Sequence, residues 1–302
     1  MFAVINLSRF QPFNLEIYYF RGDMKNCHVC KTTLPDNARF CYNCGAPQTA
    51  ATATPVRRLN YQANLPQQIE EQFILAFRQR IEEEHLASQL QEYSERLYQS
   101  GFQEVVQRRA EQLAAQIQAM TAEEKLNDSA INALLENTFE DLLDYFVIHY
   151  CKDLNTIKLP EAILSYQGVP WADINLFQMV LHYLDFASEN ESVYTDFFAM
   201  PVDRLKNASQ SFLFAQAQER IFFICDQSIL GSLREGFSIT DRGIYWKAHL
   251  EKARLVLFDN LQTIERKKEW ITINNYFFNV NPSVNLKLLK LLKKIKRTRP
   301  LT

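Results

Sequence analysis

The chain has 302 residues, of which 47% are hydrophobic, and a formal net charge of −2; this suits about two domains with real hydrophobic cores and small attachments. The charge argues against a protein that coats nucleic acid over its whole surface. With only 7 Gly and 10 Pro, long loops are limited, and no run of 18 uncharged apolar residues predicts a membrane span.

Residues 1–23 combine apolar and aromatic side chains without the period of a helix or a strand. They lack the basic start and the small-residue cleavage site of a secretory signal peptide. We interpret this segment as a non-native extension or a loosely held arm.

Two Cys-x2-Cys pairs, Cys27 with Cys30 and Cys41 with Cys44, follow at once and are separated by residues 31–40. Four thiolates at this spacing can surround one Zn²⁺ as a tetrahedron, with Zn–S distances of about 2.3 Å and no position left for water. We therefore predict a structural zinc site, and we interpret His28, inside the first pair, as a solvated bystander.

Other uses of these four cysteines fit the sequence less well. Two disulfides would suit a small secreted domain, whereas this chain is long and shows no secretion signal. A redox pair needs a strand-to-helix setting, and an iron–sulfur cluster is less typical than zinc for two pairs within a twenty-residue unit. The remaining cysteines, Cys151 and Cys225, are expected to be buried free thiols, as in a protein of the reducing cytoplasm.

The segment Met24–Gly45 resembles the short zinc ribbon that opens many bacterial proteins. The resemblance is carried by residues 24–30 and 40–45, and it implies metal binding without naming a partner. Such ribbons begin within a few residues of the first cysteine, which makes Met24 the natural start of the chain. Lys31 stands where these ribbons usually have glycine. We assign residues 24–46 to this ribbon.

Residues 47–66 are small and polar and have no apolar period, so we predict a flexible linker and a freely tethered ribbon. From residue 67 to about 120, apolar residues recur every three or four positions, with a break expected at Gly101. A second helix is predicted from about 122 to 152, with Thr121 as its N-cap, and a third over 171–188. These one-sided apolar stripes need partners, so residues 67–200 are predicted to form an all-α domain.

After Pro201 the pattern changes from helical to extended. One more helix is expected over 202–216, followed by a strand at 220–225. Alternating residues around Asp241-Arg242-Gly243 predict a hairpin of strands 236–240 and 244–247. Further strands are expected near 254–258, 262–265, 270–273 and 276–280. A final helix is predicted over 282–297, with Asn281 as its cap and Pro282 at its first position.

Several strands followed by one amphipathic helix resemble a pleckstrin-homology-like barrel. The resemblance is carried by residues 236–247, which are similar to the hairpin of bacterial domains of this type, and by residues 258–261 and 286–295. It implies a binding scaffold for residues 201–302, with no ligand carried over. The expected fold class is thus multidomain α+β: a zinc ribbon, an all-α middle domain, and a barrel with a capping helix.

The final helix is strongly basic, with no acidic residue after Glu269. We expect its leucines to cap the barrel while its basic face lies in water. The cations near the C-terminus of the helix would interact favourably with the helix dipole. The alternative is contact with an anionic membrane or with nucleic acid phosphates. The candidate contact residues are Lys287, Lys290, Lys293, Lys294, Lys296 and Arg297.

No motif predicts catalysis. The stretch 231–238 has the glycine spacing of a phosphate loop, but Phe237 stands where the lysine should be. Glu82 and His85 are spaced as metal ligands on a helix, yet no second such motif exists, so we interpret residues 82–85 as a solvated face. We therefore predict a cytoplasmic, non-enzymatic interaction protein with structural Zn²⁺; the alternative is a nucleic-acid-associated regulator or a peripheral membrane binder.

Overall fold

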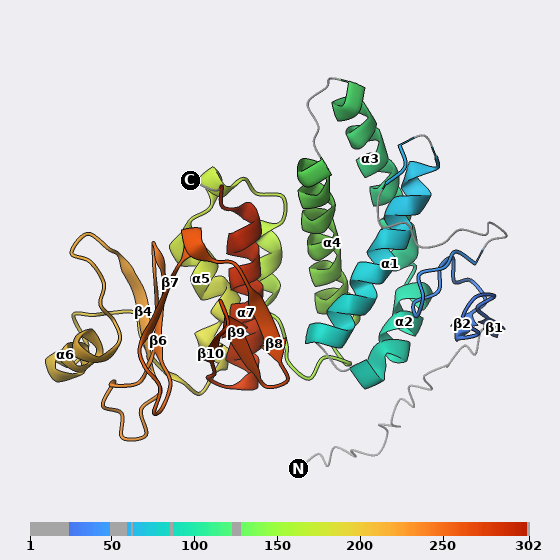
Figure 1. Ribbon diagram of the computed structural model, residues 1–302. Coiled ribbons are helices and arrows are strands. Elements are labelled where there is room, and N and C mark those ends of the chain that lie inside the picture. Colours follow the sequence, from blue (N-terminus) through green and yellow to red (C-terminus); the bar gives the residue numbers. More distant parts are fainter. Residues whose placement is uncertain (1–23, 49–58, 62, 85–86, 123–127, 301–302) are drawn as a thin grey trace, which may run out of the picture.

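The computed structural model describes residues 24–48, 59–61, 63–84, 87–122 and 128–300. The predicted arm at residues 1–23 and most of the predicted linker, residues 49–58 and 62, lie outside these ranges. The described chain is α+β and is built in layers (Figure 1). A small cysteine-bearing hairpin and a group of long helices lie on one side, and two sheets with their helices lie on the other.

The N-terminal half contains the cysteine hairpin and four long helices. The hairpin pairs β1 (Met24–Asn26) antiparallel with β2 (Thr33–Pro35). The helices are α1 (Leu65–Glu84), α2 (Leu90–Gln99), α3 (Phe102–Ala122) and α4 (Asp128–Tyr150), with a short 3-10 turn, Ala87–Gln89, before α2. The predicted break at Gly101 is confirmed: its φ is +74°, and it separates α2 from α3.

The predicted cap at Thr121 is wrong. Thr121 lies in the last turn of α3, where its hydroxyl donates a hydrogen bond to the carbonyl of Ile117 at 2.7 Å. The next helix, α4, begins only at Asp128. A hydroxyl that bonds to the carbonyl four residues earlier belongs to a helix interior, so the sequence pattern placed the boundary several residues too early.

The connection between the halves is irregular. It contains 3-10 turns at Glu161–Tyr166, Trp171–Asp173 and Phe186–Ser188, and the helix α5 (Leu176–Leu184). The sequence pattern missed the strand β3 (Ser192–Tyr194), which pairs with β4 although residues 67–200 were expected to be helical. Three residues are too few to show an alternating pattern.

The C-terminal half contains two antiparallel sheets. The five-stranded sheet has the order β3-β4-β5-β6-β7, with β4 (Ile221–Asp226), β5 (Gly236–Thr240), β6 (Gly243–Lys247) and β7 (Arg254–Leu257). The three-stranded sheet has the order β10-β9-β8, with β8 (Ile264–Lys267), β9 (Trp270–Ile273) and β10 (Tyr276–Phe278). The predicted hairpin is confirmed by the β5–β6 pairing, and a 3-10 turn, Phe258–Asn260, follows β7.

The described strands form two separate sheets and no closed barrel. The outer face of the larger sheet is covered by α6 (Val202–Ser211), whose Ala208 packs in one cluster with Ile224 and Tyr245 of the sheet (Figure 1). The structure shows a mixed α+β fold whose C-terminal half has two sheets and a C-terminal helix. The pleckstrin-homology-like resemblance is not confirmed.

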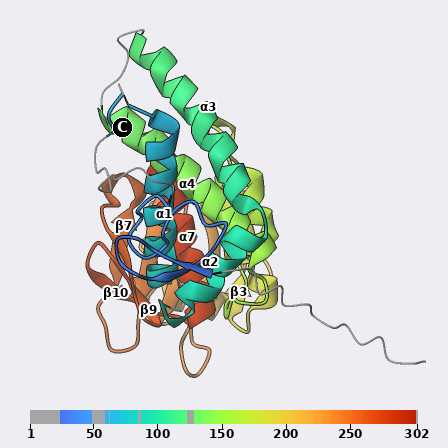
Figure 2. The same ribbon diagram turned by 90° about the vertical axis from the view of Figure 1, so that its right-hand side faces the viewer.

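The C-terminal helix α7 (Pro282–Thr298) is enclosed on both sides. The side-chain oxygen of Asn281 accepts a hydrogen bond from the Val284 amide at 2.8 Å, which confirms the predicted cap. The helix packs on β8, β9 and α5, while its other face lies towards α1 and α4 (Figures 1 and 2). The expectation that its basic face lies in water is therefore wrong for Lys287, Lys290 and Lys294, which are 2%, 1% and 4% exposed.

Candidate metal centre

The two cysteine pairs form loops with the same backbone hydrogen bonds. In the first loop the Lys31 amide donates to the Cys27 carbonyl at 3.0 Å, and the Cys27 amide donates to Thr32 at 2.8 Å. In the second, Gly45 donates to Cys41 at 2.7 Å, and Cys41 donates to Ala46 at 2.8 Å. Each loop therefore turns its two sulfurs to the same side of the backbone.

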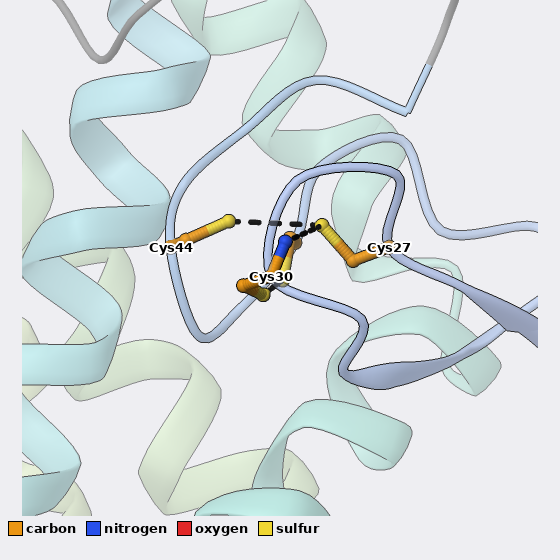
Figure 3. A group of neighbouring side chains, drawn as sticks. Cys27, Cys30 and Cys44 are labelled. Atoms are coloured by element: carbon orange, nitrogen blue, oxygen red, sulfur yellow. Dashed lines mark hydrogen bonds between the residues drawn. The ribbon is translucent and has the colours of Figure 1, made fainter.

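The four sulfurs lie together, and each ligand atom is within 4.8 Å of the others. Figure 3 shows the side chains of Cys27, Cys30 and Cys44 turned toward one another. The Sγ atoms of Cys27 and Cys44 are 3.7 Å apart, and those of Cys30 and Cys41 are 3.5 Å apart. A tetrahedral site with metal–sulfur bonds of about 2.3 Å requires sulfur separations of about 3.8 Å, whereas a disulfide requires about 2.05 Å. Cys27, Cys30, Cys41 and Cys44 thus form a candidate metal site with four thiol ligands.

Polar side chains lie beside the sulfurs of Cys30 and Cys27 and favour the thiolate form of these two. The Thr32 hydroxyl is 3.1 Å from the Cys30 sulfur, and the side-chain amide of Gln48 donates to the Cys27 sulfur at 3.5 Å. Asn43 donates to the Thr32 hydroxyl at 2.9 Å and orients it. Donors of this kind offset the negative charge that four thiolates place around one divalent ion.

The pKa values of the four thiols are split. Burial opposes ionisation, but hydrogen bonds from the Thr32 hydroxyl and amide lower the pKa of Cys30 to about 6. At Cys27, burial also opposes ionisation, but hydrogen bonds from the Cys30 and Val29 backbone amides lower the pKa of the thiol below its ordinary value. Burial dominates at Cys41 and Cys44 and raises the pKa of both.

The remaining sequence candidates are not among the four residues of this centre. His28 is exposed and is not part of the ligand group, in line with its interpretation as a bystander. Cys151 and Cys225 are buried free thiols, as expected. Burial raises the pKa of Cys151 to about 12 and also raises that of Cys225, so both thiols stay protonated.

The cysteine hairpin is docked on the helices, so the expectation of a freely tethered ribbon is wrong for the described residues 24–48. The Tyr98 hydroxyl of α2 donates to the Phe40 carbonyl at 2.5 Å, and Arg78 of α1 donates to the Asn43 carbonyl. Gly45, with a φ of +74°, lies against α1 so closely that a Cβ would stand 2.9 Å from a methyl of Leu75. Phe40 itself is buried in the main core.

The candidate contact residues of α7 lie in a buried ion network instead of on a basic surface. Acids of α1 and α4 face this helix: Lys290 is 2.6 Å from Asp144, Lys293 is 2.8 Å from Glu84, and Lys294 is 3.3 Å from Asp141. Two further members pair at the ends of the helix, Lys287 with Glu189 at 2.7 Å and Arg297 with Glu140 at 3.3 Å. Of the six, only Lys296 is exposed, and its ammonium donates to the Gln262 carbonyl at 2.6 Å.

The centre of this network was missed from the sequence. Arg80 on α1 contacts Glu84 at 2.5 Å, Asp144 at 3.1 Å, and Glu140. Its side chain is 2% exposed and that of Glu84 is 1% exposed, so the interpretation of residues 82–85 as a solvated face is wrong for Glu84. Glu82 and Glu83 are 41% and 48% exposed, as interpreted. The sequence did contain one signal for this network, the long basic face of the last helix. If that face is buried, its lysines need acidic partners elsewhere in the chain.

Among the described residues, none of the helices combines the length and the apolar character needed to cross a bilayer. Comparison with known protein families, with curated proteins and with solved structures gave no match to this chain.

Proposed function

We propose that this chain is a non-enzymatic interaction protein whose N-terminal ribbon is held by one structural Zn²⁺. The observation that carries the proposal is the cluster of four sulfurs, all within 4.8 Å of one another and with two pairs 3.7 Å and 3.5 Å apart, close to the separation that a tetrahedral site needs. An all-thiolate tetrahedral site is typical of structural zinc, because no coordination position is left for water or substrate. Iron in the same site is the competing identity, since four thiolates can also hold iron.

The ribbon stabilises the surface of the helical layer and offers few groups of its own for chemistry. Tyr98, Arg78 and Gly45 are among its contacts with α1 and α2, and the metal would fix the loop that presents the Asn43 and Phe40 carbonyls. Metal binding and docking are therefore expected to depend on each other. A module of this size buries too little apolar surface to fold without the ion.

The surface proposed for partner contact lies at one end of the strands of the five-stranded sheet. The β4–β5 and β6–β7 loops leave the sheet at this same end, because Asp226 at the end of β4 pairs with Gly236 at the start of β5, and Gly236 pairs with Lys247 at the end of β6. The tips of these loops carry Ile229, Leu230 and Leu250, which are 82%, 91% and 89% exposed. Neighbouring exposed aliphatic side chains favour a protein partner. We also propose a pleckstrin-homology-like scaffold for residues 201–302, a type of domain that serves binding.

The buried basic face of α7 does not favour the alternatives of nucleic acid or membrane binding through that helix. Lys287, Lys290 and Lys294 already contact carboxylates, so only Lys296 offers an exposed ammonium among the six candidates. The helix would have to leave the network before it could contact phosphates.

Two measurements test the proposal. Elemental analysis of purified protein is expected to show one zinc per chain, and a substoichiometric zinc content together with iron absorption bands would overturn the zinc assignment.

Affinity purification with Ile229→Ser/Leu230→Ser is expected to lose partners that the unchanged protein retains. The matched control is Phe198→Ser, since Phe198 is fully exposed in the segment that links β3 to α6, outside these two loops. Equal recovery of partners by both variants would exclude these two loops as the partner surface. Binding that appears only on anionic vesicles in a flotation assay would favour the membrane alternative.

A further inference from the structure

Glu70 lies on α1 beneath the cysteine hairpin. Arg39 of the hairpin contacts the Glu70 carboxyl group at 3.1 Å, and Arg39, Phe40 and Glu70 line a cavity of about 250 Å³ between the hairpin, α1 and α3. Glu70 is only 4% exposed. The hairpin therefore covers this carboxyl group, while the cavity is large enough to hold the water through which a proton can be exchanged.

The acids around Glu70 outnumber the bases. Glu71, the next residue of α1, is 2% exposed, and Glu111 of α3 lines the same cavity as Glu70. Among the described residues, the one cation that contacts this group is Arg39, whose side chain is 35% exposed and also donates to Gln107 of α3. Because one partly exposed arginine does not balance three acids, burial of these carboxyl groups favours their protonated form.

The other contacts of the two buried acids do little to stabilise a charge. The Gln67 side-chain amide donates to Glu71 Oε1 at 3.4 Å, and the buried Oε2 of Glu71 has no hydrogen-bond partner. Burial raises the pKa of Glu71. Burial also raises the pKa of Glu70 from the ordinary 4.5 to about 7; Glu111 and Glu71 act in the same direction, and Arg39 opposes them. At Glu70 burial therefore outweighs the ion pair.

This balance sets the direction of the pH dependence. Moving the hairpin away would expose the Glu70 carboxyl group to water and return its pKa towards 4.5. An acid whose pKa is higher in the covered state stabilises that state fully below pH 4.5, and the contribution is lost as the pH rises to about 7. The covered state thus holds the proton, and the uncovered state loses it.

We propose that Glu70 makes the position of the cysteine hairpin sensitive to pH: loss of its proton weakens the docking of the hairpin on α1 and α3, and uptake of the proton restores it. The metal site itself responds in the opposite direction, because thiols ionise and bind metal more readily as the pH rises. The switch therefore moves the hairpin and leaves its metal bound. This inference depends on the docked hairpin and is independent of the partner surface proposed above.

Nuclear magnetic resonance of the full-length protein, purified with its metal, tests the proposal between pH 5.5 and 9. The carboxyl carbon of Glu70 is expected to titrate with a midpoint near 7. Leu75 reports docking, because a Cβ on Gly45 of the hairpin would stand 2.9 Å from one of its methyl groups. That methyl resonance should shift with the same midpoint as Glu70. A methyl of Leu291 in α7, which is 0% exposed, is the reference and should not follow this midpoint.

Three variants locate the effect. Glu70→Gln still offers an acceptor to Arg39 but has no proton to lose, so the Leu75 methyl should keep its docked position throughout the range. Arg39→Gln removes the opposing charge and should raise the midpoint of both signals. Glu104→Gln, an exposed acid of α3 that does not line the cavity, should change neither midpoint.

Urea unfolding gives a second measure of the same proton. Between pH 5 and 8, the folded-to-unfolded ratio of Glu70→Gln should grow relative to that of the unchanged protein by on the order of a hundredfold, the effect of a pKa of about 7 in place of 4.5. The metal contributes equally to both proteins and cancels in this comparison.

An absence of Glu70 titration within the range would show that the ion pair decides its charge and would overturn the proposal. A midpoint near 7 with an unmoved Leu75 methyl would show protonation without a change in docking and would overturn it equally. Elemental analysis at both ends of the range follows the metal separately, and a Leu75 shift that accompanies metal loss would assign the movement to the ion instead of to Glu70.

Discussion

The helical layer α1–α4 contacts the cysteine hairpin at one side and α7 at the other, and the two contacts are built in different ways (Figure 1). The hairpin is joined mainly by hydrogen bonds to its carbonyls and by close packing at Gly45, with one ion pair, from the partly exposed Arg39 to Glu70 of α1 at 3.1 Å. The helix α7 is joined by buried ion pairs centred on Arg80, Glu84 and Lys290.

This difference shows where each contact obtains its specificity. The shape of the hairpin depends on an ion that the chain must acquire, so that contact can be removed without changing a residue. The network is encoded in the sequence, and removing one member leaves another buried charge without its partner. Removing metal should therefore affect one side of α1, and removing charge should affect the other.

The largest effect is expected from Cys41→Ser. This change removes a buried ligand and with it metal binding worth on the order of 10 kcal/mol, which is also the folding free energy of the hairpin. Hydrogen exchange should show loss of protection at the Cys27 and Gly45 amides, with the α7 amides still protected. His28→Ala serves as the control and should retain both the metal and the protection. Loss of protection in α7 as well would show that the two contacts are not separable.

Glu84→Gln is expected to destabilise the fold by about 3–5 kcal/mol, because it leaves Arg80 and two lysines of α7 short of a buried carboxylate. The matched change Glu82→Gln removes an exposed pair with Arg78 at 2.7 Å and should cost no more than about 1 kcal/mol. Urea unfolding measures both. Similar costs for the two variants would contradict the buried network.

Acid should weaken the α7 contact at a defined pH. Burial alone would raise the pKa of Glu140, but Arg80, Lys290 and Arg297 lower it from the ordinary 4.5 to about 2. A carboxylate with a lowered pKa stabilises the fold fully above pH 4.5, and this contribution, about 3 kcal/mol, is lost as the pH falls from 4.5 to 2. The difference in unfolding free energy between the unchanged protein and Glu140→Gln should shrink over that interval. Both are measured without metal, so that thiol protonation does not contribute; a difference independent of pH would argue against this role of Glu140.

The smallest effect is expected at the two cysteine loops themselves. Lys31 and Gly45 occupy equivalent positions with φ values of 62° and 74°, but only glycine adopts this conformation without a steric cost. Lys31→Gly should therefore strengthen the hairpin by up to about 1 kcal/mol, seen as slower zinc transfer to a competing chelator. Lys31→Ala keeps the Cβ and should give no gain, and an equal gain from alanine would show that the backbone conformation is not the cause.

Features set by neighbouring residues could be predicted from the sequence. The four cysteines, the turn between β5 and β6 and the Asn281 cap each depend on a few adjacent positions, and the structure brings each together as expected. The identity of the ion is a separate matter, because spacing defines ligands and geometry more closely than it defines the metal.

Features set by distant residues could not be predicted. The basic face of α7 shows that this side is polar, but periodicity does not say what covers it, and Lys293 meets Glu84 across 209 residues. The docking of the hairpin was missed for the same reason, since Tyr98 and Arg78 have nothing in their local pattern that identifies a carbonyl at Phe40 or Asn43. The pairing of such groups is decided by tertiary packing.

The position of α7 in the chain order has a consequence for biosynthesis. During translation Arg80, Glu84, Glu140 and Asp144 are all made long before the lysines that complete their network. A nascent chain therefore carries a group of three acids and one arginine that must stay hydrated until α7 leaves the ribosome. Contacts this distant in sequence form late and slowly, so the joining of the two halves is expected to follow the folding of each half.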